Sequence, residues 1–234
     1  RLVRYQPNRG KGYALKVGFA NEIGAICKAA GVDSHEVMDV FKADRKLNIS
    51  PAYLTPGMAF GGSCLPKDVR AIVHWGRHED LDIPILESVL PSNRAHLTRA
   101  YDMVARSGRR RVGVLGLSFK SGTDDLRESP MVELSERLIG RGYDLRIHDA
   151  NVALSQLLGA NRAYIDAHIP HLSRLISGSV DEVLDHAEIA LIGTRDAEVL
   201  EAVRMRPDLD VVDLVRISTN GGPDGGGRYD GLCW

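Results

Sequence analysis

Apolar residues recur every three to four positions in the first part of the chain, which is the spacing of one face of a helix. Residues 13–30 carry the first such pattern, and Gly31 follows where a helix is expected to end. Its apolar members are Leu15, Phe19, Ile23 and Ile26. A second helix is expected after Asp33, with Glu36 three residues on as in a capping box. Its apolar side consists of Val37, Val40 and Phe41.

Residues 48–63 interrupt the helical pattern with prolines and glycines, and they are expected to form a loop. A helix is predicted to restart at Pro66, since proline suits a first helical turn. Another helix is predicted over residues 84–107, with Pro91 as a point where it can bend. Helices of this length in series predict an all-α module that can also carry a dimer interface.

The second half of the chain changes to short apolar runs, which are typical of buried strands. These runs are residues 111–117, 145–148, 189–192 and 211–214. A helix over residues 131–139 is expected after the first run, and further helices are expected between the later ones. Strands that alternate with helices predict a parallel, doubly wound α/β sheet.

The predicted fold class is therefore α/β, with a helical dimerisation module followed by a doubly wound parallel α/β domain. The boundary is placed near Gly108, so that residues 13–107 form the helical domain and residues 108–234 the α/β domain. Residues 1–12 show no apolar periodicity and are treated as an atypical N-terminal segment.

Composition and charge narrow the class of protein. The chain is 44% apolar and 26% charged, as in a soluble globular protein, and its net charge of −1 does not favour a nucleic-acid partner. No apolar run approaches the roughly 18 residues of a membrane span, and no signal peptide opens the chain. Three cysteines, unevenly spaced, argue against a secreted disulfide framework and favour a reducing, cytoplasmic location.

The segment with the clearest chemistry is FGGSCLPKD, residues 60–68. Its two glycines allow the backbone to approach a ligand closely. Cys64 lies just ahead of the helix expected at Pro66, and a helix N-terminus carries roughly half a positive charge, which stabilises a thiolate. Lys67 adds a cation and Asp68 a carboxylate within one turn. A nucleophile, a cation and a base within five residues indicate covalent catalysis.

Other patterns are weaker, and Cys64 itself can be an ordinary buried thiol. His74 and His78 lie four residues apart on a helix, but no third metal ligand accompanies them, so no metal site is predicted. Gly113 and Gly116 form G-x-x-G rather than the G-x-G-x-x-G of a dinucleotide loop.

The FGGSCLPKD segment resembles the active-site loop of the UDP-glucose/GDP-mannose dehydrogenase family. Residues 118–130, SFKSGTDDLRESP, resemble its second signature, and residues 14–24, ALKVGFANEIG, are also similar. The similarity then continues with little interruption to the end of the chain. Leu65, the PSNR of residues 91–94 and the YDGLCW of residues 229–234 favour the GDP-mannose branch of the family.

This resemblance implies the oxidation of a sugar 6-hydroxyl to a carboxylate with two molecules of NAD. Cys64 would add to the aldehyde to form a thiohemiacetal, a second hydride transfer would give a thioester, and Asp68 would orient the hydrolytic water. Lys67 and Arg127 would contact the NAD cofactor. The nucleotide-sugar substrate would be bound by Asn21, Tyr53, Gly61 and Lys120. The C-terminal α/β domain would bind the nucleotide-sugar, and the protein would be a homodimer or a higher homo-oligomer.

Each of these assignments has a plainer alternative. Lys67 and Lys120 can be solvated surface residues, and Asn21 can be a solvent-facing residue in the middle of a helix. Arg127 stands among acidic residues and can form a surface ion pair worth under about 1 kcal/mol.

The chain departs from the family pattern in three places. It has no N-terminal Rossmann domain with a G-x-G-x-x-G loop, so it is not expected to oxidise its substrate alone. The family's Lys and Asn pair ahead of the first helix is replaced by Gln6 and Gly10 when no gap is allowed. Ala52, Thr55 and Met58 stand where the branch more often has an aromatic, a basic residue and a phenylalanine.

Three functions are compatible with these patterns. The first is a part of a GDP-mannose 6-dehydrogenase, and the second is a UDP-glucose enzyme with the same mechanism. The third belongs to another class, a catalytically silent nucleotide-sugar-binding protein.

Overall fold

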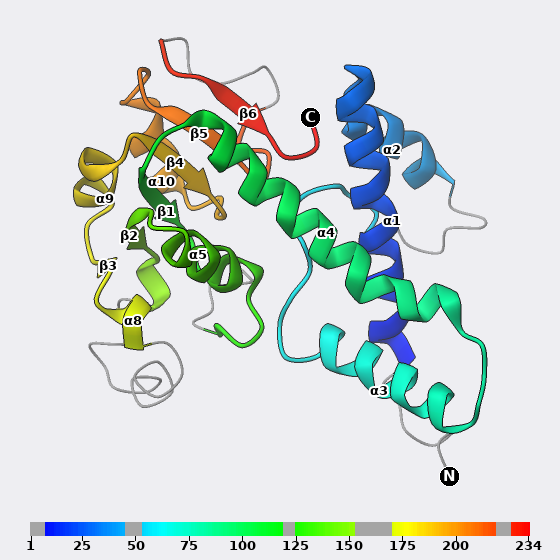
Figure 1. The fold of residues 1–234 in the computed structure, drawn as a ribbon. Coiled ribbons are helices and arrows are strands. Elements are labelled where there is room, and N and C mark those ends of the chain that lie inside the picture. The colour runs from blue at the N-terminus through cyan, green and yellow to red at the C-terminus, as the bar shows by residue number, and fades with distance from the viewer. Residues whose placement is uncertain (1–7, 45–52, 119–124, 153–169, 219–225) are drawn as a thin grey trace. The chain divides into compact units, whose positions relative to one another are not determined.

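The chain divides into two units, and the division falls within helix α4 (Pro84–Ser107). This helix begins and ends where the sequence predicts. Unit 1 contains Arg1–Arg99 together with Leu232–Trp234, and unit 2 contains Ala100–Gly231. The division falls inside α4, ahead of the boundary predicted near Gly108, because the last turns of this helix bury Met103 and Val104 within unit 2. This computed structural model describes residues 8–44, 53–118, 125–152, 170–218 and 226–234 (Figure 1).

Unit 1 is helical, as the apolar spacing predicts. Besides the first part of α4 it contains α1 (Asn8–Ala30), α2 (Ser34–Ala43) and α3 (Leu65–His78). Helix α1 starts at Asn8, five residues ahead of the predicted start at Tyr13, and ends before Gly31, whose φ of 69° suits glycine. Asp33 caps α2, because its carboxylate accepts a hydrogen bond of 2.8 Å from the His35 N–H.

The buried side of α1 is lined by small residues, not by the large apolar residues that its periodicity picks out. Ala14, Ala20, Gly24 and Cys27 are buried, whereas Phe19 is 41% exposed and Ile26 is 64% exposed. Two small cores form on the buried side of this helix. One is built from Ala14, Phe60, Val69 and Val89, and the other from Ala20, Met38 and Leu54. Small side chains allow the neighbouring loop and helices to approach the α1 backbone closely.

Gly24 provides a direct test of this close packing. A Cβ atom at Gly24 would lie 2.9 Å from the Cys233 Cβ and 3.0 Å from the Pro56 Cβ, whereas at Gly18 the nearest atom would be 4.0 Å away. We expect Gly24→Ala to destabilise unit 1 by about 1–3 kcal/mol through overpacking. Gly18→Ala should instead stabilise it by roughly 0.5–1 kcal/mol through helix propensity.

Urea unfolding followed by tryptophan fluorescence measures this difference, because both tryptophans, Trp75 and Trp234, belong to unit 1. Equal shifts of the unfolding midpoint in the two alanine variants would contradict the packing of Cys233 against α1.

Unit 2 is built on a six-stranded sheet in which all neighbouring strands are parallel. The strand order is β3-β2-β1-β4-β5-β6. The strands are β1 (Arg111–Leu115), β2 (Asp144–His148), β3 (Ile176–Ser177), β4 (Ile189–Ile192), β5 (Asp210–Asp213) and β6 (Tyr229–Gly231). The predicted parallel α/β sheet is thus confirmed. The sequence missed β3 and β6, because strands of two and three residues contain no apolar run.

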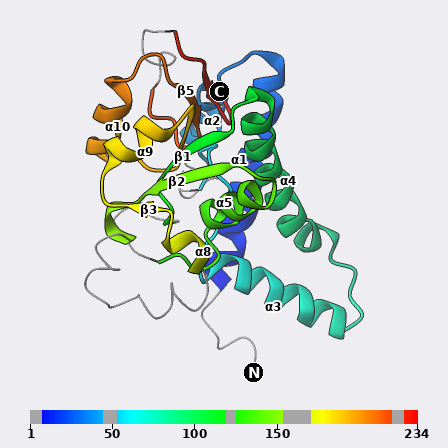
Figure 2. The same ribbon diagram turned by 60° about the vertical axis from the view of Figure 1, so that its left-hand side comes forward.

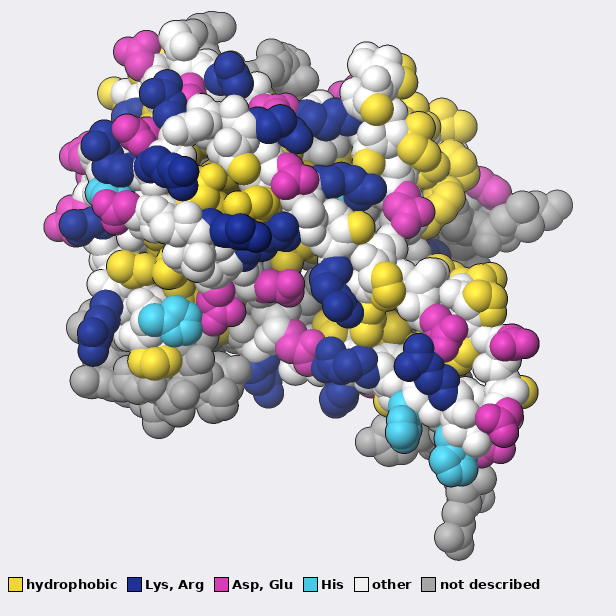
Figure 3. All heavy atoms as spheres, in the orientation of Figure 1, with side chains coloured by type: hydrophobic (Ala, Val, Ile, Leu, Met, Phe, Trp, Pro, Cys, Tyr) yellow, Lys and Arg dark blue, Asp and Glu magenta, His cyan; other side chains and the backbone are white. Residues whose placement is uncertain are grey.

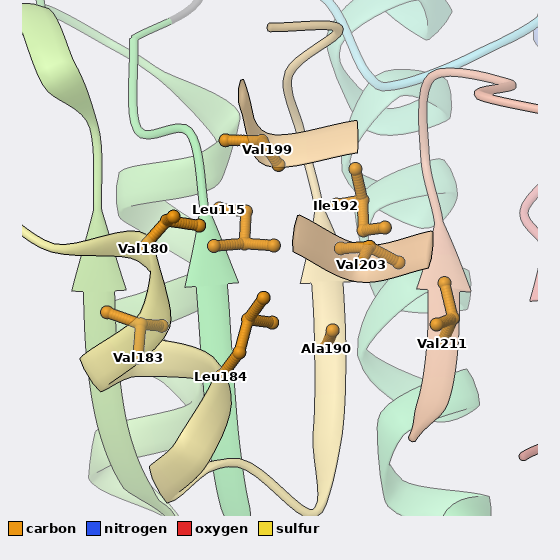
Figure 4. Close-up of a cluster of buried hydrophobic side chains, with 9 residues drawn as sticks. All are labelled: Leu115, Val180, Val183, Leu184, Ala190, Ile192, Val199, Val203 and Val211. Carbon is orange, nitrogen blue, oxygen red and sulfur yellow. The ribbon is translucent and has the colours of Figure 1, made fainter. Parts of the chain in front are cut away.

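Helices cover both faces of this sheet (Figure 2). The described helices are α5 (Pro130–Gly140), α8 (Pro170–Ser173), α9 (Val180–His186) and α10 (Ala197–Arg204). Helix α9 buries Val180, Val183 and Leu184 against the strands. Helix α10 buries Val199 and Val203 in the same cluster with residues of β1, β4 and β5, as Figure 4 shows. Helix α5 lies on the opposite face with the end of α4, where the Arg137 guanidinium lies 4.2 Å from the Tyr101 ring centroid. No helix in the described ranges is long and apolar enough to cross a membrane.

Candidate active site

Cys64 is the N-cap residue of α3, and its side chain is exposed. The helix begins at Leu65, one residue before the predicted start at Pro66. The Cys64 carbonyl accepts the first helical hydrogen bond, 2.9 Å from the Asp68 N–H, while the Cys64 side chain makes no capping bond. The exposed Cys64 therefore stands at the N-terminus of α3, the positive end of the helix dipole.

The other predicted groups of this loop lie in the first turn of the same helix or just ahead of it. Lys67 is exposed and Asp68 is half-buried, so a cation and a carboxylate accompany the thiol. Gly61 is half-buried, but it is Gly62 that adopts the left-handed conformation, with φ of 86°. The requirement for glycine is thus conformational at Gly62.

Asn21 is buried, and both ends of its amide bind the loop ahead of Cys64. Its Oδ1 accepts a hydrogen bond of 3.0 Å from the Gly57 N–H, and its Nδ2 donates one of 3.4 Å to the Met58 carbonyl. Asn21 is 2% exposed, so the solvent-facing alternative is wrong. In this structure its amide holds the loop.

Tyr53 lies near the start of the described part of this loop, and it is exposed. Its φ of 66° is uncommon for a residue other than glycine. Its ring stacks on Tyr13 of α1, with centroids 4.5 Å apart and an interplanar angle of 20°. Tyr53 is 45% exposed, and an aromatic side chain can stack on a base or a sugar.

Arg127, which belongs to unit 2, forms a bidentate ion pair within its own loop. Its guanidinium donates to both carboxylate oxygens of Asp125, at 2.8 and 2.7 Å. The hydrogen bond from Arg127 lowers the pKa of the Asp125 carboxyl. Arg127 thus forms the surface ion pair that the sequence analysis gave as the alternative to a cofactor contact. Lys120, the remaining predicted ligand of the nucleotide-sugar, lies outside the described residues.

The carboxyl edge of the sheet in unit 2 contains the topological switch point of a doubly wound fold. In the observed strand order the connections diverge between β1 and β4, and ligands of doubly wound sheets bind at such a point. Gly116 follows β1 with φ of 92°, and a Cβ there would lie 2.9 Å from the Thr194 Cβ after β4. Glycine at this position lets the two loops approach each other.

Two buried aspartates, which the sequence analysis missed, shape this edge. Asp149 follows β2 and accepts hydrogen bonds from the Leu117 N–H at 2.8 Å and the Ser118 N–H at 2.9 Å. Asp213 ends β5 and accepts from the Val215 and Ile217 N–H groups and from the Tyr229 hydroxyl. Their only sequence signal is an acidic residue at the end of an apolar strand.

The same edge does not fit a dinucleotide. The carboxylate after β2 that would bind a ribose in a dinucleotide-binding sheet is Asp149, and it is occupied by backbone N–H groups. Gly113 is not in a phosphate loop, because it lies inside β1, where a Cβ would meet α9 at 3.0–3.2 Å. Among the described residues no group of three potential metal ligands is found, and His74 and His78 are both exposed.

Two domain profiles match the chain in succession. Residues 10–95 match the central domain of the UDP-glucose/GDP-mannose dehydrogenase family, and residues 113–219 match its UDP binding domain. The chain belongs to this dehydrogenase family. The two matches lie on the helical unit and on the α/β unit, respectively.

Relatives agree with this assignment. A GDP-mannose 6-dehydrogenase of Pseudomonas syringae pv. tomato is 49% identical over 223 residues, which are 95% of this chain and 51% of the relative. The crystal structure of a ternary complex of GDP-mannose dehydrogenase from Pseudomonas aeruginosa is 46% identical, with a TM-score of 0.75 over 100% of this chain and 52% of that one. The UDP-glucose dehydrogenase of Pyrobaculum islandicum is 30% identical, with a TM-score of 0.79 over 98% of this chain and 50% of that one. This dehydrogenase-family chain spans about half the length of the relatives it matches.

Proposed function

We propose that this chain supplies the nucleophile and the nucleotide-sugar-binding part of an NAD-dependent GDP-mannose 6-dehydrogenase, which forms GDP-mannuronate. The observation that carries the proposal is the exposed Cys64 thiol at the N-terminus of α3, with Lys67 and Asp68 in the first turn. A nucleophile, a cation and a carboxylate side by side at the start of a helix are the groups that covalent catalysis requires.

In the proposed reaction the Cys64 thiolate adds to the carbon of the sugar 6-aldehyde and forms a thiohemiacetal. Loss of a hydride from that carbon and of the proton from its hydroxyl gives a thioester, and water then attacks the thioester, releasing the acid and the thiolate. The half-buried Asp68 is one turn along α3 from the sulfur and is suited to orient this water. The thiol is the reason that a primary alcohol can be oxidised twice without release of the aldehyde.

NAD, when bound, accepts the hydride from the sugar C6 at each of the two oxidations. The sheet of unit 2 does not fit NAD, since Asp149 and Gly113 serve the fold there. We therefore assign most of the NAD site to the part of the relatives that this chain does not span. Lys67 and Arg127 remain the candidate contacts from this chain, and both are exposed.

For the substrate we propose GDP-mannose, bound through its nucleotide at the carboxyl edge of the unit 2 sheet. The exposed ring of Tyr53, the backbone at Gly61 and the ammonium of Lys120 are further proposed contacts. Asn21 acts on this substrate through the loop that it holds. The GDP-mannose 6-dehydrogenases at 49% identity support this choice over UDP-glucose.

We also propose that the protein is a homodimer formed through an apolar surface of unit 1. This surface, the α1–α2 face, is built from Leu15, Phe19, Ile26, Val40 and Phe41. All five are exposed in the single chain, and the Phe19 and Phe41 rings pack edge to face at 5.6 Å. Figure 3 shows hydrophobic side chains gathered over α1 and α2. A contiguous apolar patch of this kind marks an interface.

The test is an assay of the full-length gene product with GDP-mannose and NAD. We expect two NADH for each GDP-mannuronate formed, and a kcat/KM at least about tenfold lower with UDP-glucose. Binding of GDP-mannose without any NADH would instead establish the catalytically silent binding protein. A preference for UDP-glucose would instead show that the protein is a UDP-glucose 6-dehydrogenase.

A further inference from the structure

The backbone of the loop that leads to Cys64 is bound by polar side chains of two helices. Asn21 of α1 holds Gly57 and Met58, as described above. Asn93 of α4 accepts a hydrogen bond of 2.9 Å from the Phe60 N–H and donates one of 2.8 Å to the Phe60 carbonyl. Residues 57–60, here called the hinge loop, are thus held by side chains at the Gly57 N–H, at the Met58 carbonyl and at both backbone polar groups of Phe60. Four residues after Phe60, the chain reaches Cys64.

His96, one turn along α4, binds the same loop. Its Nε2 lies 2.6 Å from the Gly57 carbonyl, and its Nδ1 lies 3.4 Å from an Nη1 of Arg99. Since the guanidinium can only donate, Nδ1 accepts and Nε2–H donates to Gly57. The ring is 1% exposed, and burial lowers the pKa of His96, which favours this neutral form. A neutral imidazole therefore supplies the donor that fixes the start of the hinge loop.

The last residues of the chain close over this contact. The Cys233 Sγ lies 4.0 Å from His96 Nε2 and 3.8 Å from the Gly57 carbonyl oxygen. Ser34 donates a hydrogen bond of 2.5 Å to the Cys233 carbonyl, and Lys28 donates one of 3.2 Å to the main-chain oxygen of Trp234. Cys233 is fully buried, and burial raises the pKa of its thiol to about 12, so it covers the hinge loop as a neutral group.

We propose that Asn93 and His96 are positioning residues for Cys64, which act through the hinge loop, and that Cys233 seals the His96–Gly57 bond from water. The proposal rests on the proposed function in one respect, that Cys64 is the reacting thiol. Phe60 joins the hinge loop to the core that it shares with Val69 of α3 and Val89 of α4. A displaced hinge loop therefore changes the start of α3, where Cys64 is the N-cap residue.

Two of the segments involved are those whose resemblance favours the GDP-mannose branch of the family. Asn93 belongs to the PSNR of residues 91–94, and Cys233 belongs to the YDGLCW of residues 229–234. The two are far apart in the sequence, and the structure brings both to the hinge loop. Asn93 and Cys233 thus support the same segment, the hinge loop.

The experiment compares His96→Met, His96→Gln and Asn93→Asp with the wild-type full-length protein. Methionine fills the space without an N–H, glutamine keeps a donor for Gly57, and aspartate keeps the shape of Asn93 without the donor to Phe60. Amide hydrogen exchange is measured in peptides covering residues 57–64, with the unit 2 sheet as internal reference. The alkylation rate of Cys64 by iodoacetamide is measured by peptide mass spectrometry.

We expect His96→Met and Asn93→Asp each to speed hinge-loop exchange by about tenfold, the effect of one lost buried hydrogen bond. Both should change the rate of Cys64 alkylation by at least about threefold, because a displaced hinge loop moves the sulfur relative to the start of α3. His96→Gln should return both rates to nearly the wild-type values. If hinge-loop exchange rises while Cys64 alkylation stays at the wild-type rate, these residues only stabilise the fold and the positioning role is wrong.

If His96→Met does not fold, the aspartate and glutamine variants decide the question in the same way. The measurements are independent of turnover, so failure of the proposed function is seen separately. It would appear as dehydrogenase activity that persists in Cys64→Ser, whatever the exchange rates.

Discussion

Cys64→Ser is expected to abolish the formation of GDP-mannuronate in the full-length protein, lowering kcat by at least about 10³-fold. A serine hydroxyl at the start of α3 keeps the shape of the site, but it is a far weaker nucleophile than a thiolate at neutral pH. The second oxidation and the thioester would then be lost. The measurement is the NADH produced per GDP-mannose, together with mass spectrometry of the product.

The same residue should stand out in a direct chemical test. Cys64 is exposed, whereas Cys27 and Cys233 are buried, so iodoacetamide should modify Cys64 first. The pKa of Cys233, raised to about 12 by burial, slows its reaction further. Cys27→Ser is the matched control, since it removes a thiol outside the FGGSCLPKD loop and should retain turnover. Full activity of Cys64→Ser, or equal alkylation of all three thiols, would show that Cys64 is not the nucleophile.

Phe19→Glu should separate the proposed homodimer into monomers. Phe19 belongs to the α1–α2 face and packs edge to face on Phe41, and a carboxylate in an apolar interface would have no partner there. Because burying an unpaired charge costs several kcal/mol, the dissociation constant of the dimer should rise at least about a hundredfold. Light scattering coupled to size-exclusion chromatography gives the mass of each form.

The control for this variant is Met205→Glu. Met205 is also an exposed apolar residue, with 72% of its surface accessible, but it belongs to unit 2 and not to the α1–α2 face. It should leave the mass of the wild-type protein unchanged. Wild-type protein that runs as a monomer at micromolar concentration would contradict the dimer. So would a Phe19→Glu protein with the same mass as wild type.

The secondary structure of this chain follows closely from local patterns. Helix α4 occupies the predicted residues, and β4 is the predicted apolar run at Ile189–Ile192. Local patterns suffice here because a helix with one buried face repeats its apolar residues every three to four positions, and a buried parallel strand is a short run of apolar residues. The short strands β3 and β6 contain no such run. They pair with β2 and β5, and the neighbouring strands determine this pairing more than their own residues do.

For the candidate site, too, the sequence predicts some features and not others. The sequence identifies Cys64, Lys67 and Asp68, because the start of a helix and the residues of its first turn are adjacent in the chain. It did not predict that Asn21 would bind Gly57 and Met58, or that His96 would bind Gly57. Those contacts join residues 36 to 39 positions apart, and only the packing of the helices determines them.

By itself the sequence determined the order of helices and strands, the parallel α/β class and the motif that contains the proposed nucleophile. Tertiary structure alone decided which face of each helix is buried. Helix α1 has two faces that could pack, and the structure buries Ala14, Ala20 and Gly24 while Phe19 and Ile26 stay exposed. The physical reason is that periodicity records only that apolar residues share a side of a helix. What covers that side depends on residues distant in the sequence or on a second chain.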